Sequence, residues 1–195
     1  MNSFMETASS LRLPVGYRFV PTEQELLLSY LYNKVIGAPL PCNVVMECDL
    51  YGEEEAWKEL FQQTDESSLY FFTELKKKND NDSRIARMTS SGSATWKNQS
   101  EKPIHYDNHN NVADGVGGHD EGKNQKTVIG FKRTFSYTSK KEGSTSSSSS
   151  TNKAKGGGWV MHEFRLAEFL LSHNQGNNIY VLCRVIKTKK GEIME

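Results

Sequence analysis

The chain has 195 residues, of which 36% are hydrophobic and 25% are charged, and its formal net charge is zero. This length predicts one domain with a sizeable core, and a mean hydropathy of −0.65 indicates long polar stretches beside that core. No run is apolar enough to span a membrane, residues 1–10 lack a secretory-signal pattern, and the three cysteines form no regular framework. We therefore expect an intracellular protein with reduced thiols.

A helix is predicted near the start of the chain. Residues 1–10 have the composition of a flexible end, and an extended aromatic segment, Leu13–Phe19, follows. Thr22 and Glu25 have capping-box spacing, in which each side chain bonds to the backbone NH of the other residue. The helix after them is expected to end near Gly37 and Pro39. Its predicted buried face consists of Leu26, Leu27, Tyr30 and Leu31.

The middle of the chain predicts short elements. Residues 44–50 fit either a short strand or a turn, and Glu53–Phe61 fits a second short helix with one apolar side. The aromatic run Leu69–Phe72 indicates a strand. Arg84–Thr89 is predicted to pair with Ala94–Lys97 across a turn at residues 90–93.

Three strands are predicted in the last third of the chain, at Val128–Tyr137, Trp159–Leu166 and Tyr180–Ile186. Residues 105–126 are rich in Asn, Gly, Asp and His, and residues 139–158 contain runs of serine and glycine. Both segments are predicted to be flexible insertions. Helices followed by strands predict an α+β domain with an antiparallel sheet.

The zero net charge hides a strong asymmetry along the chain. Between Glu47 and Glu66 there are eight acidic residues and one lysine, whereas between Lys123 and Lys155 there are eight basic residues and one glutamate. A net charge of zero, taken alone, argues against a nucleic-acid partner. Two interpretations of this separation are equally good. The charged stretches are either two solvated surface patches or the source of one positive face that binds phosphate.

Five ordered sets of segments resemble the plant NAC domain. They are Leu13–Leu26; Leu50–Trp57 with Tyr70–Phe72; Ser83, Arg84, Arg87, Thr89, Gly92, Trp96 and Lys97; Ile129–Arg133 with Trp159–Leu166; and Leu182–Val185. The octet Trp-Val-Met-His-Glu-Phe-Arg-Leu is highly specific. The resemblance covers residues 11–187 and leaves 188–195 as a basic, polar tail. It implies a twisted antiparallel sheet packed between a few helices, in a nuclear transcription factor that binds double-stranded DNA as a homodimer or as a heterodimer with another NAC protein.

The resemblance also implies site residues, since one strand edge of the NAC domain enters the major groove of DNA. The strand with Trp96 and Lys97 matches that edge. The predicted DNA-binding residues are Lys76, Lys78, Arg84, Arg87, Trp96, Lys97, Asn98, Gln99, Lys132, Lys140, Lys141, Lys153 and Lys155. The predicted dimer contact comprises Leu13, Pro14, Arg18, Phe19 and Glu25, with Arg18 and Glu25 at the positions of an arginine–glutamate pair.

Several of these residues have more than one interpretation. Trp96 is expected to pack in the core and orient Lys97. Lys132 and Arg133 are neighbours on one strand and therefore point to opposite faces, so at most one is expected to face DNA. The lysines at 76–78 fit a DNA contact, a nuclear import signal or simply a solvated turn.

The segment after Lys97 departs from the family pattern. The NAC domain usually continues Trp-Lys with Ala-Thr-Gly, then an acid and a lysine, whereas this chain has Asn98-Gln99-Ser100-Glu101-Lys102. Asparagine and glutamine bond adenine through two hydrogen bonds, which predicts an altered base preference. Glu101 is expected to repel phosphate if it faces DNA. A second hypothesis is therefore a NAC-like dimerisation partner, or a dominant-negative regulator, that binds DNA weakly.

An enzyme is the least favoured hypothesis. The sequence has no phosphate-binding loop of the Walker type and no nucleophile elbow, and its histidines and cysteines lack zinc-site spacing. His162-Glu163 begins like a metalloprotease helix motif, but Leu166 stands where the second histidine is needed. We expect no catalysis, no cofactor, no metal ion, no small-molecule substrate and no membrane association.

Overall fold

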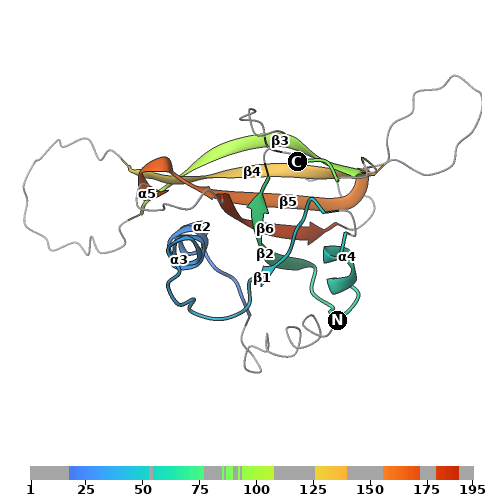
Figure 1. The fold of residues 1–195 in the computed structure, drawn as a ribbon, viewed down its shortest axis with the longest axis horizontal. Coiled ribbons are helices and arrows are strands. Elements are labelled where there is room, and N and C mark those ends of the chain that lie inside the picture. The colour runs from blue at the N-terminus through green and yellow to red at the C-terminus, as the bar shows by residue number, and fades with distance from the viewer. Residues whose placement is uncertain are drawn as a thin grey trace, which may run out of the picture.

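The computed structural model describes residues 18–52, 55–76, 85, 87–89, 92, 94–107, 126–139, 156–171 and 179–188. A six-stranded sheet with the order β1-β2-β6-β5-β4-β3 dominates this part of the chain (Figure 1). The strands are β1 Met46–Glu47, β2 Ser68–Leu75, β3 Ala94–His105, β4 Val128–Ser139, β5 Gly156–Leu166 and β6 Ile179–Lys187. The neighbouring strands in the run β2-β6-β5-β4-β3 are antiparallel, as predicted. The short β1 pairs with β2 in parallel at the other edge.

The predicted first helix is confirmed. It runs through α2 (Glu23–Glu25), a π-helical turn η1 (Leu26–Leu31) and α3 (Tyr32–Ile36). Both hydrogen bonds of the capping box between Thr22 and Glu25 are present. The helix ends at Gly37, whose φ of 71° is accessible to glycine without strain. The four residues predicted to be buried are all buried.

Helices cover both faces of the sheet because successive strand residues point to opposite faces. Phe71 belongs to the core around α4 (Trp57–Leu60), which includes Trp57, Trp96 and Tyr137. The next residue, Phe72, belongs to the core beneath η1, which includes Leu26–Leu27, Phe164 and Leu182. We call these two faces the α4 face and the α2 face. In Figure 1 the helices α2–α3 and α4 lie on either side of β1 and β2.

Some predicted boundaries differ from the structure. The second helix, expected from residue 53, occupies only Trp57–Leu60. The strand pairing predicted around residue 90 is present as an antiparallel bridge between Met88 and Thr95. The strands β3, β4 and β5 extend further than predicted, and most of the two proposed insertions lies outside the described residues. In the described part of the chain, the helices are too short or too polar to cross a membrane.

Gly130 on β4 is a place where the first helix packs closely on the sheet. A methyl group at this position would lie 2.7 Å from Cδ1 of Leu27 and closer still to the carbonyl oxygen of Arg165. Since one of these atoms belongs to the backbone, the sheet itself would have to shift to admit the methyl group. Glycine here lets η1 pack directly on β4.

We expect Gly130→Ala to lower the free energy of unfolding by about 1–3 kcal/mol, the usual cost of overpacking. Urea denaturation measures the effect. Thr138→Ser, at a half-buried position further along β4, is the control and is expected to change stability by less than about 0.5 kcal/mol. Equal stability of Gly130→Ala and the wild-type protein would contradict the close packing.

Candidate nucleic-acid interface

One side of β3 pairs with β4, and residues 87–89 cover the first residues of its other side. There the backbone NH of Thr89 donates to the carbonyl of Ala94 over 3.0 Å, and that of Trp96 donates to Arg87 over 2.9 Å. Ile85, the described residue before this segment, also forms a β-bridge, and β3 is the last strand of the sheet among the described residues. Every side chain from Lys97 to Pro103 is exposed. We call this segment the open edge.

A β-bulge interrupts the open edge where the chain departs from the NAC pattern. The register shifts between Asn98 and Ser100, so no residue of β4 lies opposite Gln99 in the backbone pairing. Its side-chain amide donates to the hydroxyl of Ser136 over 2.9 Å and to the carbonyl of Lys97 over 3.2 Å. Gln99 is therefore held in a defined position, and the side chain of Asn98 is exposed beside it. Base recognition by these two residues stays a prediction.

Trp96 is buried and cannot contact DNA directly. Its indole NH donates to the carbonyl of Leu50 over 3.2 Å, and its ring lies 5.1 Å from the ring of Tyr137 and 5.5 Å from that of Trp57. Because residues alternate along a strand, this anchor directs Lys97 away from the α4 face. Trp96 thus packs in the core as predicted, and its role in orienting Lys97 stays a prediction.

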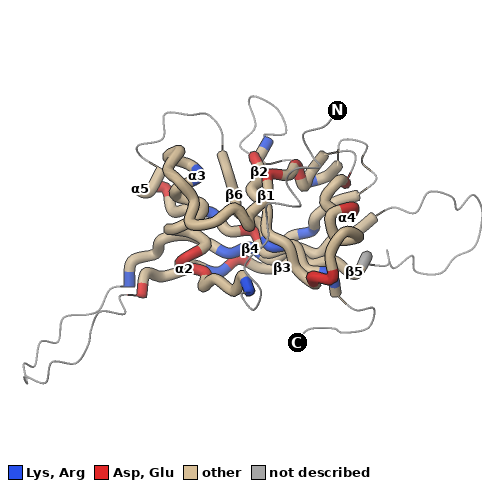
Figure 2. The backbone as a smooth tube through the Cα atoms, turned by 90° about the horizontal axis from the view of Figure 1, so that it is seen from below, with Lys and Arg blue, Asp and Glu red and all other residues tan. Residues whose placement is uncertain are grey.

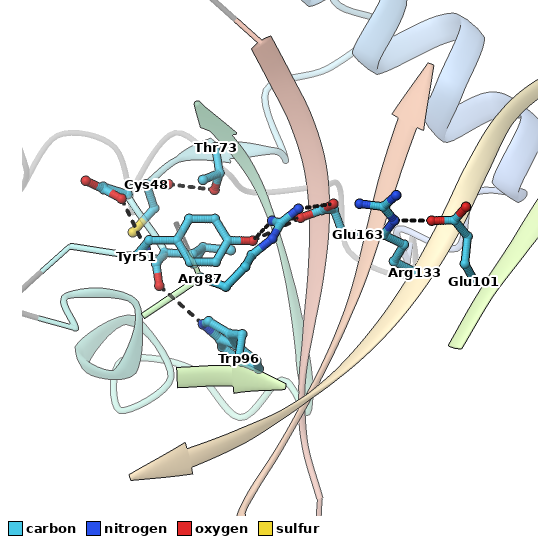
Figure 3. A network of polar contacts seen from close by, with 10 residues as sticks. Cys48, Tyr51, Thr73, Arg87, Trp96, Glu101, Arg133 and Glu163 are labelled. Atoms are coloured by element: carbon cyan, nitrogen blue, oxygen red, sulfur yellow. Dashed lines mark hydrogen bonds and ion pairs between the residues drawn. The ribbon is translucent and has the colours of Figure 1, made fainter. Parts of the chain in front are cut away.

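Arg87 lies inside the domain, where its guanidinium binds the fully buried carboxylate of Glu163 through both terminal nitrogens. It also stacks over the rings of Tyr51 and Phe135, at 5.2 and 5.0 Å. The hydroxyl of Tyr51 donates to the same carboxylate over 2.9 Å (Figure 3). Burial, followed by the charge of Glu163, raises the pKa of Tyr51 well above its ordinary value, so the hydroxyl stays protonated. The phosphate contact predicted for Arg87 is therefore replaced by an internal ion pair.

Lys132 and Arg133 point to opposite faces of β4, as predicted. Lys132 binds Glu23 of α2 over 2.6 Å, and Arg133 binds Glu101 of β3. Lys76, another predicted phosphate ligand, is exposed and binds Asp49 over 2.6 Å. This hydrogen bond raises the pKa of Lys76, which therefore keeps its charge.

The remaining predicted DNA-binding residues lie outside the described residues and are not placed. They are Lys78, Arg84, Lys140, Lys141, Lys153 and Lys155. Leu13 and Pro14 of the predicted dimer contact also lie outside.

The described part of the predicted dimer contact surrounds the start of α2. Arg18 is exposed, and Val20 beside it is 80% exposed. Phe19 is half-buried and packs edge-on against Tyr30 and Tyr70, with ring centroids 5.3 and 4.8 Å apart. The backbone NH of Thr22 donates to Glu25 and lowers the pKa of this carboxyl group, so Glu25 is ionised at neutral pH.

The sequence reasoning missed Glu163 and Tyr51. Glu163 belongs to the octet of the family resemblance and to an incomplete metalloprotease motif, and neither indicates a buried ion pair, although a carboxylate inside an apolar strand is itself a signal of a buried partner. Arg87 was the available cation, but 76 residues separate the two along the chain. No three His, Cys, Asp or Glu side chains in the described ranges are grouped to hold a metal ion.

Comparison with known proteins places these features in a family. The family model "No apical meristem (NAM) protein" matches residues 14–166. Over 190 residues the chain is 34% identical to NAC domain-containing protein 41 of Arabidopsis thaliana, covering 96% of this chain and 59% of that protein. It is 30% identical to NAC transcription factor 32 of Arabidopsis thaliana, covering 97% and 64%. It is 32% identical to NAC domain-containing protein JA2 of Solanum lycopersicum, covering 91% and 43%. The chain thus spans less than two thirds of the length of each of these relatives.

We expect Arg87→Met to lower the free energy of unfolding by about 3–5 kcal/mol, because it leaves the Glu163 carboxylate buried without a cation. The double variant Arg87→Met, Glu163→Leu removes both charges and should recover most of this loss in urea denaturation. A double variant as unstable as Arg87→Met would show that the ion pair does not explain the role of Arg87.

His162 predicts a pH dependence of stability. Burial, then the charges of Lys132 and Arg184, lowers its pKa from 6.5 to about 4. Between these two pH values the unfolded chain binds a proton that the folded chain does not bind. The free energy of unfolding should therefore fall as the pH drops from about 6.5 towards 4.

His162→Gln should flatten this fall, as measured by urea denaturation at a series of pH values. His105→Gln, at an exposed histidine of β3, is the matched control and should leave the slope unchanged. If the wild-type slope persists in His162→Gln, the pH dependence arises from other groups.

Proposed function

Because this chain belongs to the NAC family, we propose that it is a nuclear transcription factor that binds double-stranded DNA as a dimer, with the open edge of β3 in the major groove. The observation that carries the proposal is this edge, a polar and exposed run from Lys97 to Pro103 at the border of the sheet. The major groove, about 12 Å wide, admits a two-stranded β-ribbon. β3 and β4, each 12 residues long, form such a ribbon.

Lys97 is one of the two lysines of the open edge, with Lys102, and it is the one that the family resemblance places at a DNA contact. Lys76, Lys132 and Arg133 are each paired with an acid, whereas no ion pair joins Lys97 to another described residue. A lysine that neutralises a phosphate releases condensed counterions, which gives affinity independent of base sequence. Asn98 and Gln99 follow Lys97 directly, and their amides are suited to hydrogen bonds with base edges.

The exposed surface at the start of α2 supports the dimeric part of the proposal. Arg18 and the ionised Glu25 occupy the positions of the arginine–glutamate pair that the family resemblance implies, and Val20 adds an exposed apolar side chain. A dimer of either kind would bury Val20 and pair these charges. An exposed pair of this type contributes little affinity, but it favours the correct partner.

A second candidate function is a NAC-like partner that dimerises but binds DNA weakly. The observation in its favour is that carboxylates neutralise both cations of β4, the strand next to the open edge, through the pairs Glu23–Lys132 and Glu101–Arg133. Replacing Asn98-Gln99-Ser100 with Ala-Thr-Gly discriminates the two candidates. A large rise in affinity favours the weak binder, and unchanged binding to the same site favours the sequence-specific factor.

For the proposed function, we expect Lys97→Ala to weaken binding to all duplexes and to reduce the salt dependence of log K by about 0.9, the share of one phosphate contact. Gln99→Ala should instead change which duplexes are preferred. Selection from a random duplex pool, followed by fluorescence anisotropy across a salt series, measures both effects.

Lys187→Ala, at an exposed lysine on β6 three strands from β3, is the control and should change neither quantity. Binding that ignores salt and shows no preference among duplexes would refute the proposed function. If Gln99→Ala merely weakens binding, Gln99 does not recognise a base.

A further inference from the structure

We propose that Lys132 and Arg133 form a two-sided phosphate clamp behind the open edge, and that Glu101 weakens this clamp. The inference rests on the proposed insertion of β3 into the major groove and assigns new roles to residues of the same site. It differs from the expectation that at most one of the two cations faces DNA.

The two cations lie directly behind the edge strand, one on each face of the sheet. Register pairs join Glu101 to Arg133 and Lys102 to Lys132, so both cations belong to the strand next to the open edge. Lys132 lies on the α2 face, where it binds Glu23. Arg133 lies on the α4 face, beside Glu101 and in line with Glu163 (Figure 3). Acidic and basic residues alternate where α2, β4 and β3 meet (Figure 2).

When an edge strand lies in the major groove, one sugar–phosphate backbone of the DNA runs along each face of its sheet. We call these two backbones the phosphate walls. Neighbouring strands lie about 4.8 Å apart, so β4 follows β3 closely. Lysine and arginine side chains are long enough to extend past one strand towards the nearer wall. Two consecutive residues on β4 therefore face different walls, which is the arrangement that a clamp requires.

Arg133 can exchange its carboxylate partner for phosphate without disturbing the core. It lies in register between Glu101 on β3 and Glu163 on β5. Arg87 already neutralises the buried Glu163 through two nitrogens. The described ion-pair partner of Arg133 is Glu101 alone, whose side chain is 40% exposed. Breaking this pair thus leaves a hydrated carboxylate and not a buried charge.

Glu101 then acts as the residue that sets affinity. Ion pairs between exposed groups are weak in water, so a phosphate competes with Glu101 for the guanidinium. After the exchange, the carboxylate remains close to the phosphate and repels it. Removing this charge should strengthen binding only if Arg133 is present to use the freed position.

The test compares wild type, Glu101→Gln, Arg133→Gln and the double variant by fluorescence anisotropy, on the duplex that the wild-type protein selects from a random pool. We expect Glu101→Gln to tighten binding about threefold to tenfold at 0.1 M salt, and to steepen the salt dependence of log K by up to about 0.9. Arg133→Gln should weaken binding, and Glu101→Gln should then give little further gain. The variants Glu23→Gln and Lys132→Gln, and the two combined, repeat the same comparison on the α2 face.

Two further measurements complete the design. Arg133→Lys keeps the charge and should retain the salt dependence that Arg133→Gln loses. Urea denaturation of each variant separates a change in DNA contact from a change in folding.

An equal gain from Glu101→Gln with and without Arg133 overturns the clamp, because the carboxylate would then act on DNA alone. No gain in either background also overturns it. If Lys97→Ala still weakens binding in these cases, the proposed function stands without the clamp. If no variant binds DNA with salt dependence, both proposals fail.

Discussion

The buried carboxylate of Glu163 is the constraint from which the rest of the interface follows. A carboxylate in the middle of a sheet needs a cation and hydrogen-bond donors, and Arg87 and Tyr51 supply them from two segments outside β5. By binding Glu163, Arg87 holds residues 87–89 along the first residues of β3. In the described part of the chain these backbone hydrogen bonds reach Trp96, and the exposed side chains of the open edge begin at the next residue. An internal ion pair therefore holds the segment that covers the start of the edge strand.

The segment that departs from the NAC pattern coincides with an irregularity in the sheet. Where the family has small residues, this chain has Asn98, Gln99 and Ser100, and the register of β3 against β4 shifts at this point. Gln99 fills the bulge and is tied to Ser136 on the neighbouring strand. A longer polar side chain thus projects where the family pattern has small residues. If β3 enters the major groove, this position determines which base edges the chain contacts.

Opposite charges form blocks along the sequence, and in the structure several of them also form ion pairs. Carboxylates from α2 and β3 neutralise the two cations of β4, and Asp49 neutralises Lys76. Counting charge along the chain directs attention to residues 123–155, whereas the cations of β4 next to the open edge are balanced by carboxylates nearby. If this edge binds DNA as proposed, its affinity depends on how readily exposed carboxylates are replaced by phosphate.

The sequence by itself determined the local elements and the family. Capping residues predicted the start of the first helix, apolar spacing predicted its buried face, and alternating or aromatic runs predicted most of the strands, because these signals act over a few neighbouring residues. Ordered motifs predicted the NAC fold. Only the tertiary structure decided the roles of Arg87, Lys132 and Arg133, whose partners lie 76, 109 and 32 residues away. Whether a cation faces solvent or a buried acid depends on the strand order and register, which bring distant residues together, and sequence spacing does not report them.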